Sequence, residues 1–113
     1  MTTLYHNPHC RKSREALQLL EEAKEPLNII LYLKDTLTES AIKKLLTMLD
    51  ISPLALVRKN EGIWKEQYKG AELSDADVIK AMQEHPKLIE RPIAVKNGKA
   101  IIGRPPEEVL KLL

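Results

Sequence analysis

Residues 5–14 read Tyr5-His6-Asn7-Pro8-His9-Cys10-Arg11-Lys12-Ser13-Arg14. This stretch predicts a strand that runs through an Asn-Pro turn into a helix. It contains the only cysteine of the chain, near the expected amino end of that helix. Five basic side chains come before the first acidic residue, Glu15: His6, His9, Arg11, Lys12 and Arg14. Helix amino ends and nearby cations both favour a thiolate, so the sequence predicts a reactive Cys10. The alternative is that Cys10 is a small buried hydrophobic residue.

The size of the expected pKa shift indicates where it should come from. Lowering a thiol pKa from about 8.5 to roughly 6.5 takes about 2.7 kcal/mol. A helix end contributes about 0.3–1 kcal/mol of this. Nearby cations or hydrogen bonds must provide the remainder, and we expect the basic stretch around Cys10 to supply it.

The bulk composition is that of an ordinary globular protein. The chain has 113 residues, 30% of them charged and 43% hydrophobic, which predicts one compact domain. Eighteen Lys and Arg against sixteen Asp and Glu leave a net charge of +2, which gives no reason to expect a nucleic-acid partner. A single cysteine excludes an intrachain disulfide, so a redox cycle must take its second thiol from another molecule.

The segments on either side of the Cys10 turn predict a βαβ unit. Residues 3–6 form the expected first strand, and apolar positions from Ala16 to Ala23 give the following helix one buried face. Pro26 marks the end of this helix, and the apolar run 27–33 predicts a strand covered on both faces. We expect the two strands to be parallel. There is no signal-peptide pattern and no apolar run of membrane-spanning length, so we expect a cytoplasmic protein without a membrane partner.

The middle of the chain, from about residue 34 to residue 86, predicts helices. Ser52-Pro53 is typical of an N-cap followed by proline at the first helical position. Residues 74–77 resemble a capping box, and Pro86 should close the helix that follows. We interpret Trp64 as a packing anchor rather than a ligand-stacking residue.

The last third predicts a hairpin followed by a helix. Asn97-Gly98 lies between two apolar runs, which is the strongest short hairpin signal. If these two residues form the loop, the register places Arg91 opposite Arg104 at the open end. Like charges directly opposite repel, which favours an anion between them; the alternative is that both arginines are solvated. If the third strand runs antiparallel to the first, this open end lies beside Cys10. Residues 106–113 predict a closing helix.

Several separated motifs resemble the glutaredoxin-coupled arsenate reductase (ArsC) family, and most closely its short ArsC-like YfgD branch. The resemblance covers essentially the whole chain. The motifs are His6-Asn7-Pro8-His9-Cys10, Ser13-Arg14, Leu56-Val57-Arg58-Lys59-Asn60, Glu90-Arg91-Pro92-Ile93 and Gly103-Arg104-Pro105. The resemblance implies an α/β, thioredoxin-like fold: βαβ then ββα around a mixed four-stranded sheet. It also implies that residues 1–113 form one domain with a helical insertion at about 34–86.

The resemblance further implies a site and a reaction. Cys10 would attack the arsenic of arsenate, while three arginines would bind the oxyanion: Arg58, Arg91 and Arg104. Pro92 would be a cis-proline facing the cysteine. The family needs no metal and no bound organic cofactor; glutathione acts as co-substrate, and glutaredoxin is the partner. We expect the chain to be a monomer.

Supporting roles are expected in the Cys10 turn. Asn7 should shape the turn through its own backbone bonds. His6 either lowers the thiol pKa when protonated or packs at the strand end. Ser13 either caps the first helix or supports the thiolate directly. Arg14 adds positive charge.

The sequence also departs from the family pattern. Arg11-Lys12 stand where the family usually has Gly-Thr, and the family's longer carboxy-terminal extension is missing. Two alternatives therefore stay open: a glutaredoxin-like monothiol oxidoreductase with another substrate, and an Spx-like regulator that binds RNA polymerase. Many Spx-like proteins carry a Cys-x-x-Cys switch, which Ser13 excludes here.

Overall fold

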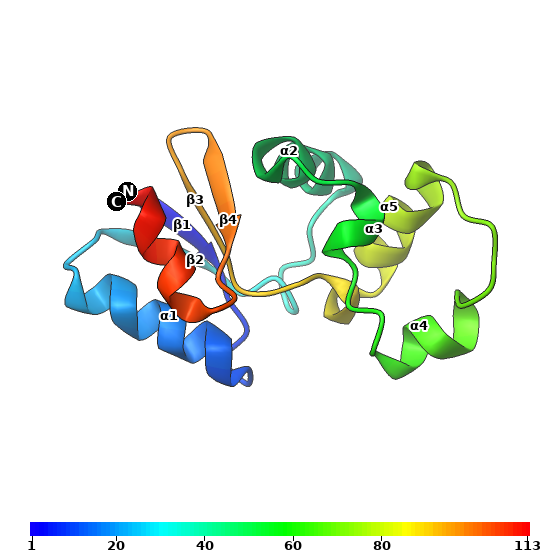
Figure 1. Ribbon diagram of the computed structural model, residues 1–113, viewed down its shortest axis with the longest axis horizontal. Helices are drawn as coiled ribbons and strands as arrows, with labels where there is room; N and C mark the ends of the chain where they lie inside the picture. Colours follow the sequence, from blue (N-terminus) through cyan, green and yellow to red (C-terminus); the bar gives the residue numbers. More distant parts are fainter. The chain divides into compact units, whose positions relative to one another are not determined.

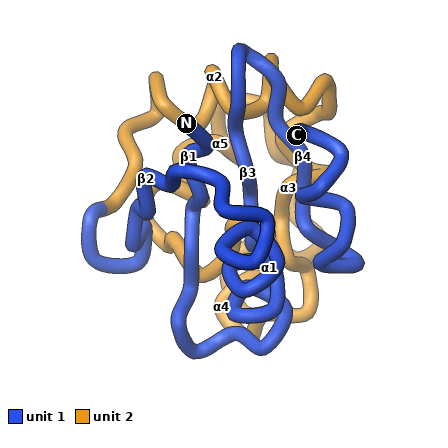
Figure 2. Tube along the Cα trace, turned by 90° about the vertical axis from the view of Figure 1, so that its left-hand side faces the viewer, with its two compact units in different colours: residues 1–35, 91–113 blue, residues 36–90 orange.

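A four-stranded sheet with helices forms the first of the two units into which the chain divides (Figure 2). The computed structural model describes residues 1–113. The first unit consists of residues 1–35 and 91–113, and the second consists of residues 36–90. None of the helices is long and apolar enough to span a membrane.

The sheet of the first unit has the order β2-β1-β3-β4. Its strands are β1 (Thr2–Tyr5), β2 (Leu27–Ile30), β3 (Ile93–Lys96) and β4 (Lys99–Ile102). β1 is parallel to β2 and antiparallel to β3, which confirms the predicted βαβ unit and the predicted direction of the third strand. The hairpin register is also as predicted, with Lys96 opposite Lys99. Asn97 and Gly98 both have positive φ, as a two-residue hairpin loop requires. The fold is thioredoxin-like.

β2 differs from its prediction. It ends at Ile30, because residues 31–34 turn: the amide of Lys34 donates to the carbonyl of Leu31 at 3.0 Å. Asn28 is exposed, and the side chain of Ile29 is 43% exposed. The expectation of a strand covered on both faces was wrong, because β2 lies at the edge of the sheet and pairs only with β1.

The core of the first unit lies between the sheet and two helices, α1 (Arg11–Glu22) and η2 (Pro106–Leu112). Figure 1 shows these two helices side by side against the strands. η2 is a 3₁₀ helix rather than the expected α-helix. One cluster of fully buried residues in this core consists of Leu4, Ala16, Leu20, Ala94 and Val109. This packing fixes the start of α1 relative to the ends of β1 and β3.

The second unit is helical. Its elements are α2 (Glu39–Leu49), α3 (Pro53–Leu56), α4 (Gly62–Gln67), α5 (Asp75–Glu84) and η1 (Pro86–Leu88). The predicted caps are confirmed: Ser52 accepts from the amide of Ala55, and Ser74 and Asp77 form a capping box. Trp64 is buried and stacks on Tyr68 with ring centroids 5.3 Å apart, as expected of a packing anchor.

Candidate active site

Cys10 is the N-cap residue of α1. Its backbone is extended (φ −98°, ψ 123°), and its side chain is partly exposed. The amide of Cys10 donates to the carbonyl of Asn7 at 3.0 Å, and the carbonyl of Cys10 accepts from the amide of Arg14 at 3.0 Å. These two bonds hold the cysteine at the junction of the turn and the helix.

The turn before Cys10 is built around two buried polar side chains, Asn7 and Ser13. The side-chain oxygen of Asn7 accepts from the amide of His9 at 3.0 Å, which is the turn-shaping role predicted for it. The hydroxyl of Ser13 accepts from the amide of Asn7 at 3.0 Å and lies 2.6 Å from Nδ1 of His6. Ser13 therefore does not cap α1 with its hydroxyl: it ties the end of β1 to the first turn of the helix.

His6 is buried at the strand end, where its ring contacts only Ser13 through a hydrogen bond. Burial lowers the pKa of His6, the charge of Arg14 lowers it further, and Glu21 opposes both. A ring whose pKa lies below its ordinary value is neutral at pH 7. Of the two roles considered for His6, the structure favours packing over electrostatic support of the thiolate.

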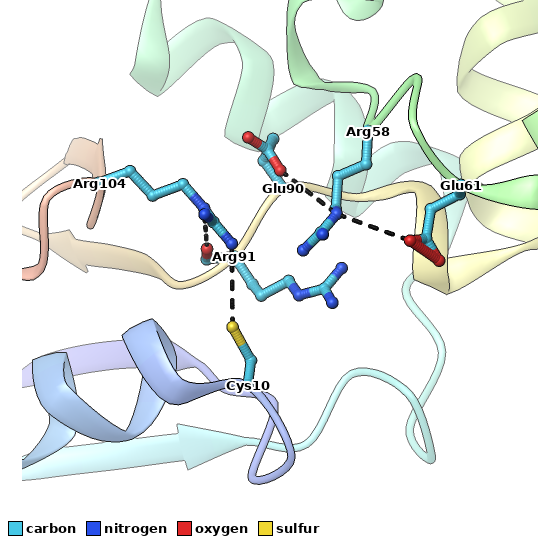
Figure 3. A network of polar contacts seen from close by, with 6 residues as sticks. All are labelled: Cys10, Arg58, Glu61, Glu90, Arg91 and Arg104. Atoms are coloured by element: carbon cyan, nitrogen blue, oxygen red, sulfur yellow. Dashed lines mark hydrogen bonds and ion pairs between the residues drawn. The ribbon is translucent and has the colours of Figure 1, made fainter.

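Two arginines approach the sulfur from the open end of the β3–β4 hairpin. The Nε of Arg104 donates to the carbonyl of Arg91 at 2.9 Å, and its Nη2 lies 3.8 Å from the Sγ of Cys10 (Figure 3). The pairing of Ile93 with Ile102 continues the register that sets Arg91 opposite Arg104. The guanidinium of Arg104 therefore contacts the backbone carbonyl of Arg91 and also reaches the Cys10 sulfur.

Close packing beneath these arginines fixes their backbone. Gly103 approaches Pro92 so closely that a Cβ at position 103 would lie 2.7 Å from the Cγ of Pro92 and 3.0 Å from Val109. The amide of Gly103 donates to the carbonyl of Pro92 at 2.8 Å. The Arg91–Pro92 bond is cis, as predicted, and so is Arg104–Pro105, which we did not predict.

The pKa of the Cys10 thiol is lowered by groups other than those the sequence suggested. Burial raises this pKa, but the amide of Ser13, the guanidinium of Arg91 and the amide of Lys12 together outweigh burial. No side-chain hydrogen bond of standard geometry caps α1, so the two amides act as nearby dipoles directed at the sulfur. The net result is a thiol that ionises more readily than an ordinary cysteine.

The expectation that the basic stretch supplies the shift was therefore wrong. Arg11 is exposed and donates to Glu15 at 2.9 Å, while Arg14 donates to the carbonyl of Pro8 at 3.0 Å. His9 is exposed. The physical reason is the geometry of a first helical turn, in which side chains point outward while the N–H groups point along the axis toward the N-cap.

Arg58 belongs to the second unit. A bridge between Val57 and Ile89 brings two short segments together, and the amide of Arg58 donates to the carbonyl of Leu88 at 2.7 Å. The Nε of Arg58 lies 3.6 Å from Glu90 and 4.0 Å from Glu61 (Figure 3). Its Nη1 is buried and has no hydrogen-bond partner. Local sequence patterns could not find this arginine, because the bridge that buries it joins segments about thirty residues apart in the chain. The structure has no group of three or more His, Cys, Asp or Glu side chains arranged for a metal ion.

Comparisons with known proteins agree on one family. Residues 5–112 match the ArsC family. The chain is 45% identical to the Escherichia coli "uncharacterized protein YfgD" over 97% of this chain and 94% of that protein. It is 41% identical to an arsenate reductase of Haemophilus influenzae over 97% of both chains. A solved structure, an arsenate reductase from Vibrio cholerae, superposes with a TM-score of 0.95 at 46% identity, covering 99% of this chain and 97% of the other. With a matched family over nearly its whole length and an activated cysteine at the start of α1, this chain belongs to the ArsC family.

Proposed function

We propose that this protein is an arsenate reductase that uses glutathione and glutaredoxin as its source of electrons. The observation that carries the proposal is the placement of a low-pKa Cys10 thiol 3.8 Å from the guanidinium of Arg104. A nucleophile beside a fixed cation suits an anionic electrophile, because the cation both attracts it and offsets the charge that develops on it. Relatives named arsenate reductase, at 41% identity, supply the identity of that electrophile.

In the first proposed step, the Cys10 thiolate attacks the arsenic of arsenate. A sulfur–arsenic bond forms, and one arsenate oxygen leaves as water after taking up protons. Arg91 and Arg104 bind the remaining oxygens, since a planar guanidinium can hold an oxyanion through two donors at once. The amides of Lys12 and Ser13, which already lower the pKa of Cys10, stabilise the negative charge at the start of α1.

Arg58 is proposed as the third guanidinium of the oxyanion site. The support for this role is the resemblance to the family, together with a buried Nη1 that has no hydrogen-bond partner. A buried donor without a partner is costly, and an anion is a natural acceptor for it. The carboxylates of Glu61 and Glu90 orient Nε and leave Nη1 available.

In the second proposed step, glutathione supplies the other thiol. Two electrons pass to arsenic as the sulfur–arsenic bond breaks and the sulfurs of Cys10 and glutathione join, so that arsenite leaves with its three oxygens and a Cys10–glutathione disulfide remains. Glutaredoxin then transfers the glutathionyl group away and regenerates the thiol. A chain with one cysteine needs such an external thiol, and the cycle needs a reducing compartment, for which we propose the cytoplasm.

The test is arsenate-dependent oxidation of NADPH, coupled through glutathione reductase, glutathione and glutaredoxin. We expect activity in the native chain and none in Cys10→Ser. Arg104→Lys keeps the charge but loses the planar fork, and we expect it to lower kcat/KM by about tenfold to a hundredfold. The control is Arg11→Ala, which removes an exposed positive charge from α1, the helix that begins at Cys10. We expect its activity to be close to that of the native chain.

Two outcomes would contradict the proposal. Retained activity in Cys10→Ser would remove Cys10 as the nucleophile. Absence of arsenate-dependent turnover in a folded protein whose Cys10 still titrates below an ordinary cysteine would leave the thiol chemistry and exclude arsenate. In that case, removal of glutathione from a glutathionylated protein, measured without arsenate, would identify a monothiol oxidoreductase.

A further inference from the structure

The charges along α1 run against the helix dipole at both ends. The first turn has no acidic residue and carries Arg11, Lys12 and Arg14, while Glu21 and Glu22 occupy the last turn, which has no basic residue. Cations at the amino end and anions at the carboxyl end each destabilise a helix relative to the opposite arrangement. By contrast, α5 begins with acids, and η2 begins with acids and ends with a lysine. The charges on α1 are therefore not there to stabilise the helix.

These three cations do not serve the thiolate either. The pKa of Cys10 is lowered by Arg91 and by two backbone amides, with no contribution from the side chains of the first turn. Arg11 is paired with Glu15, and Arg14 is held by the carbonyl of Pro8. Lys12 is exposed and forms neither an ion pair nor a side-chain hydrogen bond. Lys12 is therefore the positive charge of this turn that is available to an external ligand.

Lys12 is also close to Cys10 along the chain. It is the second residue of α1, in the same first turn that Cys10 caps, and its backbone amide is directed at the Cys10 sulfur. The flexible stem of a lysine lets its ammonium reach any group attached to the sulfur or about to attack it. A carboxylate carried by an incoming thiol would lie within one side-chain length of this charge.

The extent of the positive surface indicates the size of the ligand. It is confined to one helical turn, because Glu15 follows immediately and Glu21 and Glu22 make the far end of α1 acidic. A partner protein with an acidic face would meet repulsion along the rest of the helix. A small anionic thiol would meet only the first turn, and glutathione, a tripeptide with two carboxylates, has the required charge and size.

We propose that Lys12 determines specificity for the thiol co-substrate by pairing with a carboxylate of glutathione as its sulfur meets Cys10. This inference rests on the proposed function, which names glutathione as the electron donor.

The test uses a reaction that contains no arsenate. The Cys10 thiolate attacks a disulfide, a new sulfur–sulfur bond forms at Cys10, and one thiolate leaves, which can be followed by mass spectrometry of the quenched protein. The probes are glutathione disulfide, which is anionic; hydroxyethyl disulfide, which is neutral; and cystamine, which is cationic. Dividing each rate by that for the neutral disulfide removes any change in the pKa of Cys10 itself.

We expect the native chain to prefer glutathione disulfide and to disfavour cystamine at low ionic strength. The preference for glutathione disulfide should fall by about twofold in Lys12→Gln and about fivefold in Lys12→Glu, with the opposite trend for cystamine. Salt at 0.5 M should reduce these differences, because exposed charges are screened. The matched control is Lys99→Glu, which makes the same charge change at an exposed position in the hairpin and should leave every ratio as in the native chain.

Ratios that are the same in Lys12→Glu and in the native chain would overturn the proposal. So would a fall of equal size in Lys99→Glu, because the effect would then reflect net charge alone. If the ratios stay constant while glutaredoxin-coupled turnover falls in Lys12→Glu, the basic turn binds the partner protein instead, and the proposal also fails. A chain that shows the expected ratios but reduces no arsenate would keep the Lys12 inference and lose only the proposed substrate.

Discussion

The starts of α1 and α5 solve the same physical problem in opposite ways. Both helices begin with backbone N–H groups that no carbonyl of the helix can accept. At α5, Ser74 and Asp77 form a capping box, and Asp75 adds a second acid in the first turn. At α1, the N-cap residue is Cys10, there is no capping hydrogen bond of standard geometry, and the first turn is basic.

The difference shows what each helix start is for. The N–H groups of α5 are satisfied within the protein, which stabilises the second unit. Those of α1 remain directed at a sulfur, whose pKa they lower. Local choices that contradict the usual rules for stability tend to mark functional positions.

The largest effect is expected when Arg91 is replaced by alanine. Arg91 lowers the pKa of Cys10 through both a hydrogen bond and its charge, so the pKa of the thiol should be higher in Arg91→Ala than in the native chain. The measurement is the pH dependence of alkylation by iodoacetamide. Arg11→Ala is the matched control and should titrate as the native chain does. Equal shifts in the two variants would mean that the general positive field, and not Arg91, activates the thiol.

Removing the cap of α5 should have the next largest effect, and only on stability. Ser74→Ala loses the bond from the amide of Asp77 to the Ser74 hydroxyl, while the backbone amide of residue 74 can still donate to Asp77; the free energy of unfolding should fall by about 1 kcal/mol in urea titrations. Ser52→Ala loses a single bond of 3.4 Å at α3 and should cost less. Neither variant should change the thiol pKa. A larger loss in Ser52→Ala would show that the capping box is not what stabilises the start of α5.

The same contrast explains how much the sequence could predict. Ser74-Asp77 and Asn97-Gly98 are local signals, in which a few adjacent residues determine the backbone, and the structure confirms both. The register that follows from Asn97-Gly98 was enough to set Arg91 opposite Arg104. The register did not predict that the Nε of Arg104 donates to the carbonyl of Arg91, a bond that forms where Gly103 packs closely against Pro92.

Predictions failed where tertiary context decides. The run 27–33 has the composition of a buried strand, but its place at the sheet edge follows from the topology of the whole unit. Counting basic residues near Cys10 could not show that their side chains point away while their amides point inward. Arg58 was identified through family resemblance alone, because its neighbours are brought to it by a bridge between distant segments.

Giving α1 a cap should stabilise the protein while ending its thiol chemistry. In Cys10→Ser, the hydroxyl can accept a hydrogen bond from the amides at the start of α1, since Cys10 already has the extended backbone of an N-cap residue. We expect Cys10→Ser to be about 0.5–1 kcal/mol more stable than Cys10→Ala at pH 6 in urea titrations. Cys10→Ala is the matched control because it removes the thiol without adding a cap. A Ser variant less stable than the Ala variant would show that α1 cannot be capped at this position.

The stability of the native chain relative to Cys10→Ser should also depend on pH. The folded protein lowers the pKa of Cys10, so ionisation of this thiol stabilises the folded state. That contribution is fully present above the unfolded pKa of about 8.5 and is lost as the pH falls through the folded pKa. The free energy of unfolding of the native chain should therefore increase relative to that of Cys10→Ser as the pH rises toward 9. A difference that does not change with pH would mean that folding leaves the thiol pKa unshifted.

The smallest effect concerns Lys12, where stability and the proposed recognition of glutathione should change in opposite directions. Lys12→Glu places an acid in the first turn of α1, as Asp75 does in α5, and should raise the free energy of unfolding by about 0.5 kcal/mol at low ionic strength. The gain should disappear in 0.5 M salt, because the interaction of exposed charges with the helix end is screened. If Lys12→Glu is more stable and yet reacts more slowly with glutathione disulfide, then the lysine is retained at a cost to the helix. If Lys12→Glu is no more stable than the native chain, then the basic first turn does not destabilise α1. The reversed charges of α1 would then not indicate a functional role.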